Sequence, residues 1–223
     1  MPGAAVHTVP VTQHGRFLLT RPAGAGPWPL LLGFHGYAEN AETMDAVLGR
    51  LPGAGDWLRV SVQGLHRFYH PKRGDVIASW MTREDRELAI ADNIGYVDAV
   101  LGRVEHDHGR PPCVVHVGFS QGVAMAWRAA LRCARRADGV VVLGGDIPPE
   151  LREDLAASPP ALLARGDTDE WYTAEQFDSD LAALGAQGAR AEAFTFPGGH
   201  AWDDAVLARA GQFLAAVRQG RAP

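Results

Sequence analysis

Short apolar runs recur along the chain, and stretches with helical spacing of apolar residues separate most of them. The runs are nearly continuous, as expected for strands that are covered on both faces of a sheet. They lie at Leu30–Phe34, Trp57–Val62, Cys113–Phe119, Val140–Leu143, Ala161–Ala164 and Ala191–Phe196. The helical stretches lie at Glu42–Leu51, Arg83–Glu105, from Gln121 onward, Ala174–Leu184 and Asp203–Val217. This alternation predicts an α/β fold, with a mostly parallel central sheet and helices on both faces.

Two parts of the chain are less regular. The N-terminal part predicts a pair of strands near Val6–Thr12 and Arg16–Arg21, followed by a turn rich in Pro and Gly at Pro22–Pro29. The segment Gln63–Met81 is rich in aromatic residues, His, Gly and Pro, and we expect it to be irregular. Because no repeat, linker or long insertion is apparent, the sequence predicts a single domain over residues 1–223 without a large cap domain.

Composition narrows the class of protein. The 223 residues include 26 acidic and 21 basic ones, which argues against a nucleic-acid binder. No apolar stretch reaches the ~18 residues of a membrane span, and Met1–Pro10 lacks the features of a signal peptide. Cys113 and Cys133 are expected to be free buried thiols. We therefore expect a cytoplasmic protein that acts on a small molecule.

The pentapeptide Gly118-Phe119-Ser120-Gln121-Gly122 lies where a buried strand meets a helical pattern. A serine between two such glycines is typical of a nucleophile elbow, a turn so sharp that side chains at the flanking positions would collide. The turn places the hydroxyl of Ser120 at a helix N-terminus, where unpaired N–H groups favour developing negative charge. The sequence therefore predicts that Ser120 is a nucleophile.

A serine nucleophile needs a neighbouring base, and His200 is the best placed of the nine histidines. It follows the glycine-rich loop after the last predicted strand, at the edge of the sheet where sites form in such folds. His116 lies inside the strand before Ser120, so we expect a core residue, and we expect a structural role for His35. His66 and His70 are four residues apart, as zinc ligands on one helix face can be. The sequence offers no third ligand beside them, so it does not predict a zinc site.

The base in turn needs a carboxylate that holds its other ring nitrogen. The loop after Ala161–Ala164 offers Asp167 and Asp169, and Asp146 follows the preceding strand. We favour Asp169 and keep the other two as alternatives; an aspartate that is not used for this purpose is expected to accept loop N–H groups. The chain order Ser120, Asp169, His200 is the one found in α/β-hydrolases.

Reaction at a carbonyl also needs donors for the developing oxyanion. The backbone N–H of Gln121, directly after the nucleophile, is one candidate. The second is the backbone N–H of Tyr37, because His35-Gly36 directly after a strand predicts a close turn that aims the next N–H into the site.

The motifs together resemble the phospholipase/carboxylesterase family, the acyl-protein-thioesterase-like branch of the α/β-hydrolases. They are His35-Gly36, Ser79-Trp80, Gly118-Phe119-Ser120-Gln121-Gly122, Gly166-x-x-Asp169 and Gly199-His200. The resemblance implies a triad of Ser120, Asp169 and His200, an oxyanion hole of Tyr37 and Gln121, and Trp80 and Met81 near the substrate. The chain departs from the family pattern at Arg165, where the family usually has His, and at Trp171-Tyr172, where it has Val-Pro. It also lacks the Gly-Asp that is common after His-Gly.

Aromatic and apolar residues of the irregular segments predict an apolar cleft for the substrate. These residues are Phe68, Tyr69, Trp80, Met81, Trp171 and Trp202. The predicted activity is hydrolysis of short- to medium-chain carboxylic esters or thioesters through an acyl-enzyme on Ser120, with no metal or organic cofactor. The alternatives are a dienelactone-hydrolase-like or peptidase-like enzyme, and a non-catalytic ligand-binding relative. The leaving group and the oligomeric state stay open.

Overall fold

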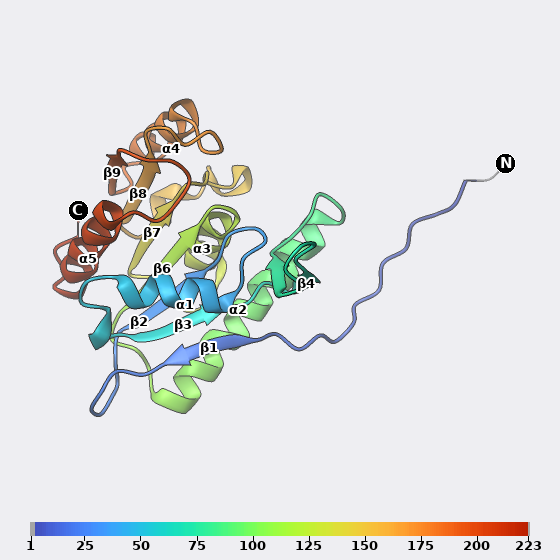
Figure 1. The fold of residues 1–223 in the computed structure, drawn as a ribbon, viewed down its shortest axis with the longest axis horizontal. Helices are drawn as coiled ribbons and strands as arrows, with labels where there is room; N and C mark the ends of the chain where they lie inside the picture. The colour runs from blue at the N-terminus through green and yellow to red at the C-terminus, as the bar shows by residue number, and fades with distance from the viewer. Residues whose placement is uncertain (1–2, 223) are drawn as a thin grey trace.

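All six predicted buried runs form neighbouring parallel strands of one sheet (Figure 1). The computed structural model describes residues 3–222. The sheet has seven strands in the order β1-β3-β2-β6-β7-β8-β9, with β1 antiparallel to β3 at one edge. The strands are β1 (Phe17–Thr20), β2 (Leu30–Phe34), β3 (Leu58–Val62), β6 (Val114–Phe119), β7 (Gly139–Leu143), β8 (Ala161–Gly166) and β9 (Ala191–Phe196). The predicted mostly parallel sheet is confirmed.

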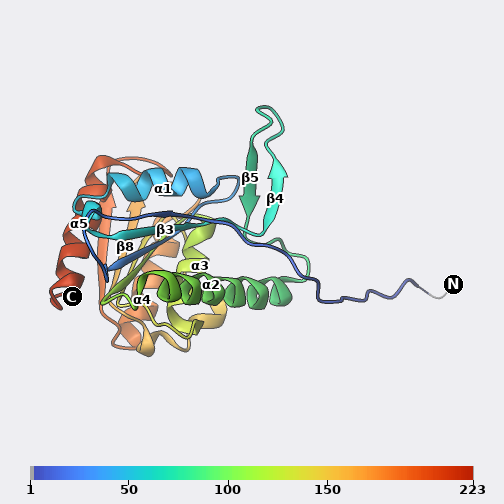
Figure 2. The same cartoon turned by 90° about the horizontal axis from the view of Figure 1, so that it is seen from below.

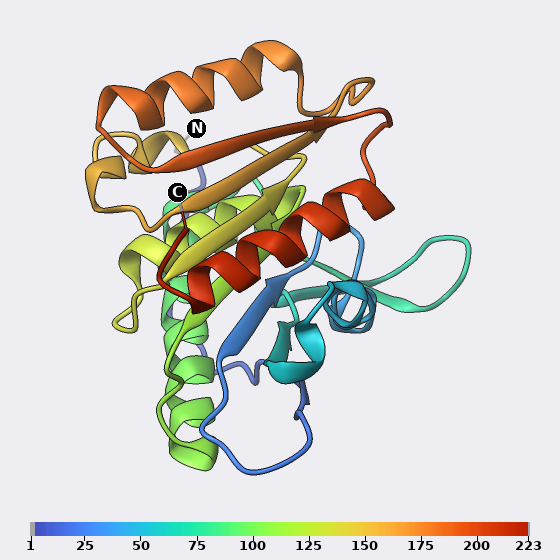
Figure 3. The ribbon, with the colours of Figure 1, turned by 90° about the vertical axis from the view of Figure 1, so that its left-hand side faces the viewer.

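Five helices cover the two faces of the sheet. They are α1 (Ala41–Arg50), α2 (Arg86–His108), α3 (Gln121–Arg132), α4 (Ala174–Ala186) and α5 (Asp204–Arg218), each close to its predicted bounds. Residues of α1 and α5 pack in one core against the sheet, and residues of α2, α3 and α4 pack in another core on the opposite face (Figures 2 and 3). Short 3₁₀ turns at Ala54–Asp56, Pro149–Leu151 and Leu155–Ala157 were not predicted. Cys113 and Cys133 are free and buried, as expected.

Two predictions for the irregular parts are wrong. Val6–Thr12 is not a strand but exposed chain, because no neighbouring strand pairs with it; the second predicted strand corresponds to β1. The segment Gln63–Met81 contains a hairpin of β4 (His66–Tyr69) and β5 (Val76–Ser79), which stands away from the main sheet (Figure 2). Within residues 3–222, no block of helices large enough to form a cap is inserted between the strands.

The turn from β6 into α3 is as crowded as the glycine pattern predicts. A Cβ on Gly122 would lie 2.2 Å from the carbonyl oxygen of Phe34 and 2.6 Å from that of His35. A Cβ on Gly118 would lie 2.7 Å from the carbonyl oxygen of Gly122. Since these are backbone atoms, no rotation of a side chain can relieve the contact. Helix α3 therefore lies so close to the end of β2 that only glycine fits at position 122.

The substitution Gly122→Ala is therefore expected to destabilise the protein. An overpacked core typically loses about 1–3 kcal/mol, which corresponds to a melting temperature roughly 2–10 °C lower for a chain of this length. Gly95→Ala in α2 is the matched control, since a Cβ there meets nothing within 4 Å and alanine favours the helix by about 1 kcal/mol. Thermal unfolding of both variants checks this. Equal melting temperatures for the two variants would contradict the close approach.

Candidate active site

Ser120 lies at the sharp turn between β6 and α3, with φ 52° and ψ −121°. Residues other than glycine rarely adopt this conformation, and it costs about 1–3 kcal/mol. The surrounding structure imposes it: the N–H of Ser120 donates to the carbonyl oxygen of Leu143 at 2.9 Å, and the helix begins at the next residue. The backbone at Ser120 is that of a nucleophile elbow.

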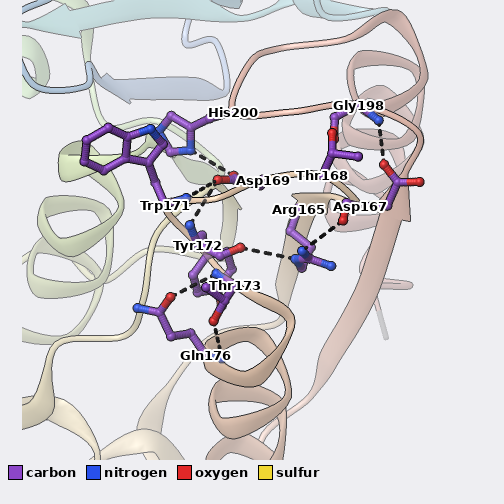
Figure 4. A network of polar contacts seen from close by, with 10 residues as sticks. All are labelled: Arg165, Asp167, Thr168, Asp169, Trp171, Tyr172, Thr173, Gln176, Gly198 and His200. Carbon is purple, nitrogen blue, oxygen red and sulfur yellow. Dashed lines mark hydrogen bonds and ion pairs between the residues drawn. The ribbon is translucent and has the colours of Figure 1, made fainter.

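His200 and Asp169 form a close pair at the ends of β9 and β8 (Figure 4). Nδ1 of His200 lies 2.8 Å from Oδ2 of Asp169, whose side chain is fully buried. The other carboxylate oxygen accepts the backbone N–H groups of Trp171 at 2.9 Å and Tyr172 at 3.0 Å. Burial alone would raise the pKa of Asp169, but these hydrogen bonds from Tyr172, His200 and Trp171 outweigh it and lower the pKa. Asp169 is therefore held as a carboxylate facing the imidazole.

Ser120 and His200 line the same cavity, which has a volume of about 430 Å³. The imidazole is packed on both sides: its centroid lies 4.9 Å from that of Phe119, and a Cβ on Gly144 would lie 2.8 Å from Cε1 of His200. In the described part of the chain, the Ser120 hydroxyl has no hydrogen bond with His200. Such contacts are often longer before a substrate binds. In the part of the chain that the structure describes, the two residues therefore line one cavity without a hydrogen bond between them.

The three candidate aspartates have different environments. Asp169 contacts His200, whereas Asp167 is exposed and accepts the N–H of Gly198 at 2.9 Å. That contact is the loop-stabilising role expected of an unused aspartate (Figure 4). Asp146 is exposed at the rim of the cavity. Of the three, only Asp169 is hydrogen-bonded to the imidazole of His200 among the described residues.

The loop that carries Tyr37 lies close to Ser120, since a Cβ on Gly36 would lie 3.3 Å from the Cβ of Ser120. Gln121 is the first residue of α3, so its N–H has no acceptor within the helix. Neighbouring N–H groups of the other loop are engaged: Gly36 donates to the Glu39 carboxylate at 2.7 Å, and Ala38 donates to the Ala78 carbonyl at 3.0 Å. Among residues 3–222, neither Tyr37 nor Gln121 has a protein acceptor for its N–H. Backbone N–H groups without an acceptor are the kind of donor that stabilises an oxyanion.

The side chain of Gln121 has a role that the sequence did not reveal. Its Oε1 accepts the N–H of Trp80 at 3.0 Å, and its Nε2 donates to the carbonyl oxygen of Met81 at 3.0 Å. The hydroxyl of Ser79 is also within hydrogen-bond distance of the amide. One side chain thus fixes the end of β5 close to Ser120.

Trp80, which was expected near the substrate, is not among the residues that line the cavity. The indole is fully buried, stacked on the ring of His35 at 5.1 Å, and its Nε1 donates to the His35 carbonyl oxygen at 2.8 Å. Trp80 therefore supports the Tyr37 loop from beneath. Met81 and Trp171 do line the cavity, and Trp171 is 80% exposed.

The cavity differs from the predicted cleft, because three arginines are among the residues that line it. Phe68, Tyr69 and Trp202 do not line it; Phe68 packs against Tyr37 and Trp202 against Phe119. Arg83 from the loop before α2, Arg86 from the start of α2 and Arg128 from α3 line it together with Met81 and Trp171.

Arg165, where the chain departs from the family pattern, supports the loop that carries Asp169. Its Nε donates to the carbonyl oxygen of Tyr172 at 3.2 Å, and Nη2 lies 3.4 Å from that of Asp167 (Figure 4).

Within residues 3–222, no three His, Cys, Asp or Glu side chains are grouped so that they could hold a metal ion.

His35 and His116 are buried structural residues, as expected. Nε2 of His35 accepts the N–H of Gly64 at 2.9 Å, and Nδ1 donates to the carbonyl oxygen of Gly36 at 2.7 Å. Nδ1 of His116 lies 3.2 Å from the Ala126 carbonyl oxygen. Burial lowers the pKa of each imidazole from 6.5 to about 4. Both are therefore neutral at pH 7.

This predicts a loss of stability in mild acid. Below pH 6.5 the unfolded chain binds protons at both histidines, whereas the folded protein does so only near pH 4. The free energy of unfolding should fall in this window by up to about 1.4 kcal/mol per pH unit for each histidine. Urea unfolding between pH 6.5 and 5 checks this, with His116→Gln as the comparison. The variant should show a shallower pH dependence, and an unchanged slope would contradict the assignment.

Solved structures with a similar fold include esterases and a thioesterase. Esterase PE8 is 25% identical with a TM-score of 0.70, and the match covers 91% of this chain and 98% of that one. Zea mays acyl-protein thioesterase 2 is 18% identical with a TM-score of 0.71, covering 92% and 99%. A carboxylesterase from Mesorhizobium loti is 22% identical with a TM-score of 0.70, covering 90% and 93%.

These matches confirm the resemblance inferred from the motifs: the fold is that of the α/β-hydrolases, of the phospholipase/carboxylesterase-like kind. No protein-family model and no curated protein sequence matches the chain.

Within residues 3–222, each helix is too short or too polar to cross a bilayer.

Proposed function

We propose that this chain, with the fold of carboxylesterases and thioesterases, is a serine hydrolase of short- to medium-chain carboxylic esters or thioesters. The observation that carries the proposal is the hydrogen-bonded pair of His200 and Asp169 in the same cavity as Ser120, at a strained elbow. A protein that only binds a ligand has no need of that combination. The cavity of about 430 Å³ is of the size that small ligands occupy.

The proposed reaction has two steps. The hydroxyl oxygen of Ser120 attacks the carbonyl carbon while Nε2 of His200 takes the hydroxyl proton, and the N–H groups of Tyr37 and Gln121 stabilise the oxyanion. The intermediate expels the alcohol or thiol, which receives that proton from His200. Water, deprotonated by His200, then attacks the acyl group on Ser120, and the acid leaves as Ser120 regains a proton. Asp169 holds the imidazole in the required tautomer throughout.

A fluorophosphonate probe tests the proposal directly. Such probes form a stable phosphonyl adduct only on an activated serine, so the purified protein should gain one adduct, located by mass spectrometry on Ser120. The Ser120→Ala variant is the control and should gain none. A folded protein that does not react would refute the proposal and favour the non-catalytic ligand-binding alternative. A series of nitrophenyl esters and acyl thioesters of increasing chain length would then define the acyl group and the leaving group.

A further inference from the structure

The guanidinium group of Arg128 is buried, and several of its N–H donors have no oxygen acceptor among the described residues. Its side chain is 1% exposed, yet it lines the cavity that holds Ser120. Nε donates to Oε1 of Glu150 at 2.7 Å, and Nη2 lies 2.7 Å from the same oxygen without being aligned to donate to it. Nη1 reaches only the thioether sulfur of Met81, at 3.6 Å. A guanidinium has five N–H donors, and leaving buried ones without an oxygen acceptor is unfavourable.

Two further arginines add positive charge to the same cavity. Arg86 shares Glu150 with Arg128, at 3.7 Å from its second carboxylate oxygen. Arg83 is exposed, and in the described part of the chain it has neither an ion pair nor a hydrogen bond from its side chain. The residues lining the cavity thus include three guanidinium groups and one carboxylate, that of Asp146. The carboxylates of Asp146 and Glu150 are fewer than the three guanidinium groups, and both arginines that are ion-paired here share Glu150.

The spacing along α3 sets the distance between the charge and the nucleophile. Gln121, Ala124 and Arg128 all line the cavity, because they lie on one face of the helix. Seven residues of helix span about 10 Å. An anion held by Arg128 would therefore lie several bonds from a carbonyl group at Ser120, within a single small substrate.

We propose that the preferred substrate is an ester or thioester that carries an anionic group, a carboxylate or a phosphate, several bonds from the reacting carbonyl. Arg128 and Arg83 bind the anion, with Arg86 beside them. This inference rests on the proposed esterase activity and adds the substrate class to it. Arginine is suited to the task because its planar fork binds carboxylate and phosphate oxygens through paired, charge-assisted hydrogen bonds.

Matched pairs of chromogenic esters test the inference. The 4-nitrophenyl monoester of adipic acid is compared with 4-nitrophenyl hexanoate, and the 5-phosphonopentanoate ester distinguishes phosphate-like from carboxylate preference. A second pair, 5-butanoyloxy-2-nitrobenzoate against 4-nitrophenyl butanoate, places the anion on the leaving group. We expect kcat/KM for the charged member of one pair to exceed that of the neutral member by at least about tenfold, the worth of one charge-assisted hydrogen bond.

Two variants and a control test whether the arginines cause the preference for charged esters. Arg128→Gln and Arg83→Gln should lower kcat/KM for the charged ester more than for the neutral ester, and so reduce the preference towards equality. Arg83 is exposed, so its variant is informative even if Arg128→Gln fails to fold. Arg132→Gln is the control: it removes the same charge from the same helix at a residue that pairs with Asp154 outside the cavity, and it should keep the preference.

Equal kcat/KM for charged and neutral esters in the wild-type protein would overturn the inference while leaving the proposed function intact. The same holds if both arginine variants keep the full preference. A folded protein that cleaves no ester and takes no fluorophosphonate would instead overturn the proposed function, and this inference with it.

Discussion

Replacement of Ser120 by alanine is expected to reduce kcat for a nitrophenyl ester by about 10⁴- to 10⁶-fold. In the proposed mechanism the hydroxyl oxygen forms the acyl-enzyme. Without it, His200 has no oxygen to activate except that of water. Binding should change little, because the hydroxyl contributes only a small part of the cavity wall.

The measurement is steady-state turnover of 4-nitrophenyl butanoate, with circular dichroism and thermal unfolding to show that the variant is folded. Any residual rate must be insensitive to fluorophosphonate. Turnover within tenfold of wild type in folded Ser120→Ala protein would place the nucleophile elsewhere.

Asp169→Asn is expected to cost about 10³- to 10⁴-fold in kcat. In the structure, Oδ1 of Asp169 accepts the N–H groups of Trp171 and Tyr172. The asparagine oxygen should keep those two bonds, which turns its NH₂ group towards Nδ1 of His200. Nδ1 must then accept, so the ring proton moves to Nε2. That tautomer cannot remove a proton from Ser120.

Asp167→Asn is the matched control, because it makes the same chemical change two residues away in the same loop. Asp167 is exposed and accepts the N–H of Gly198, so its variant should keep nearly full kcat. Equal losses in the two variants would argue against Asp169 as the partner of the base.

The sequence was most informative where backbone crowding restricts the choice of residue. Gly118 and Gly122 are glycines because strand and helix backbones nearly touch there, so their spacing predicted the turn and the position of Ser120. The buried strands were equally clear, because a strand covered on both faces has to be apolar. His200 and Asp169 could be placed at one edge of the sheet because they follow the ends of parallel strands.

The sequence was least informative where the direction of a side chain decides its role. Trp80 and Met81 are neighbours, but successive side chains in extended backbone point to opposite sides, so Met81 lines the cavity while Trp80 is buried under His35. The hairpin of β4 and β5 was missed because its strands are short and partly polar. Arg128 was missed because an arginine in a helix normally points to solvent, and only the tertiary structure buries it.

The positive φ at Ser120 means that stability and the proposed activity favour different residues at this one position. Glycine adopts that conformation without penalty, so a chain with glycine at position 120 would tolerate more heat while having no nucleophile. Directed evolution that selects survivors of heating alone would therefore enrich inactive proteins at this codon. Thermostable forms of this protein have to be selected for turnover and heat tolerance together.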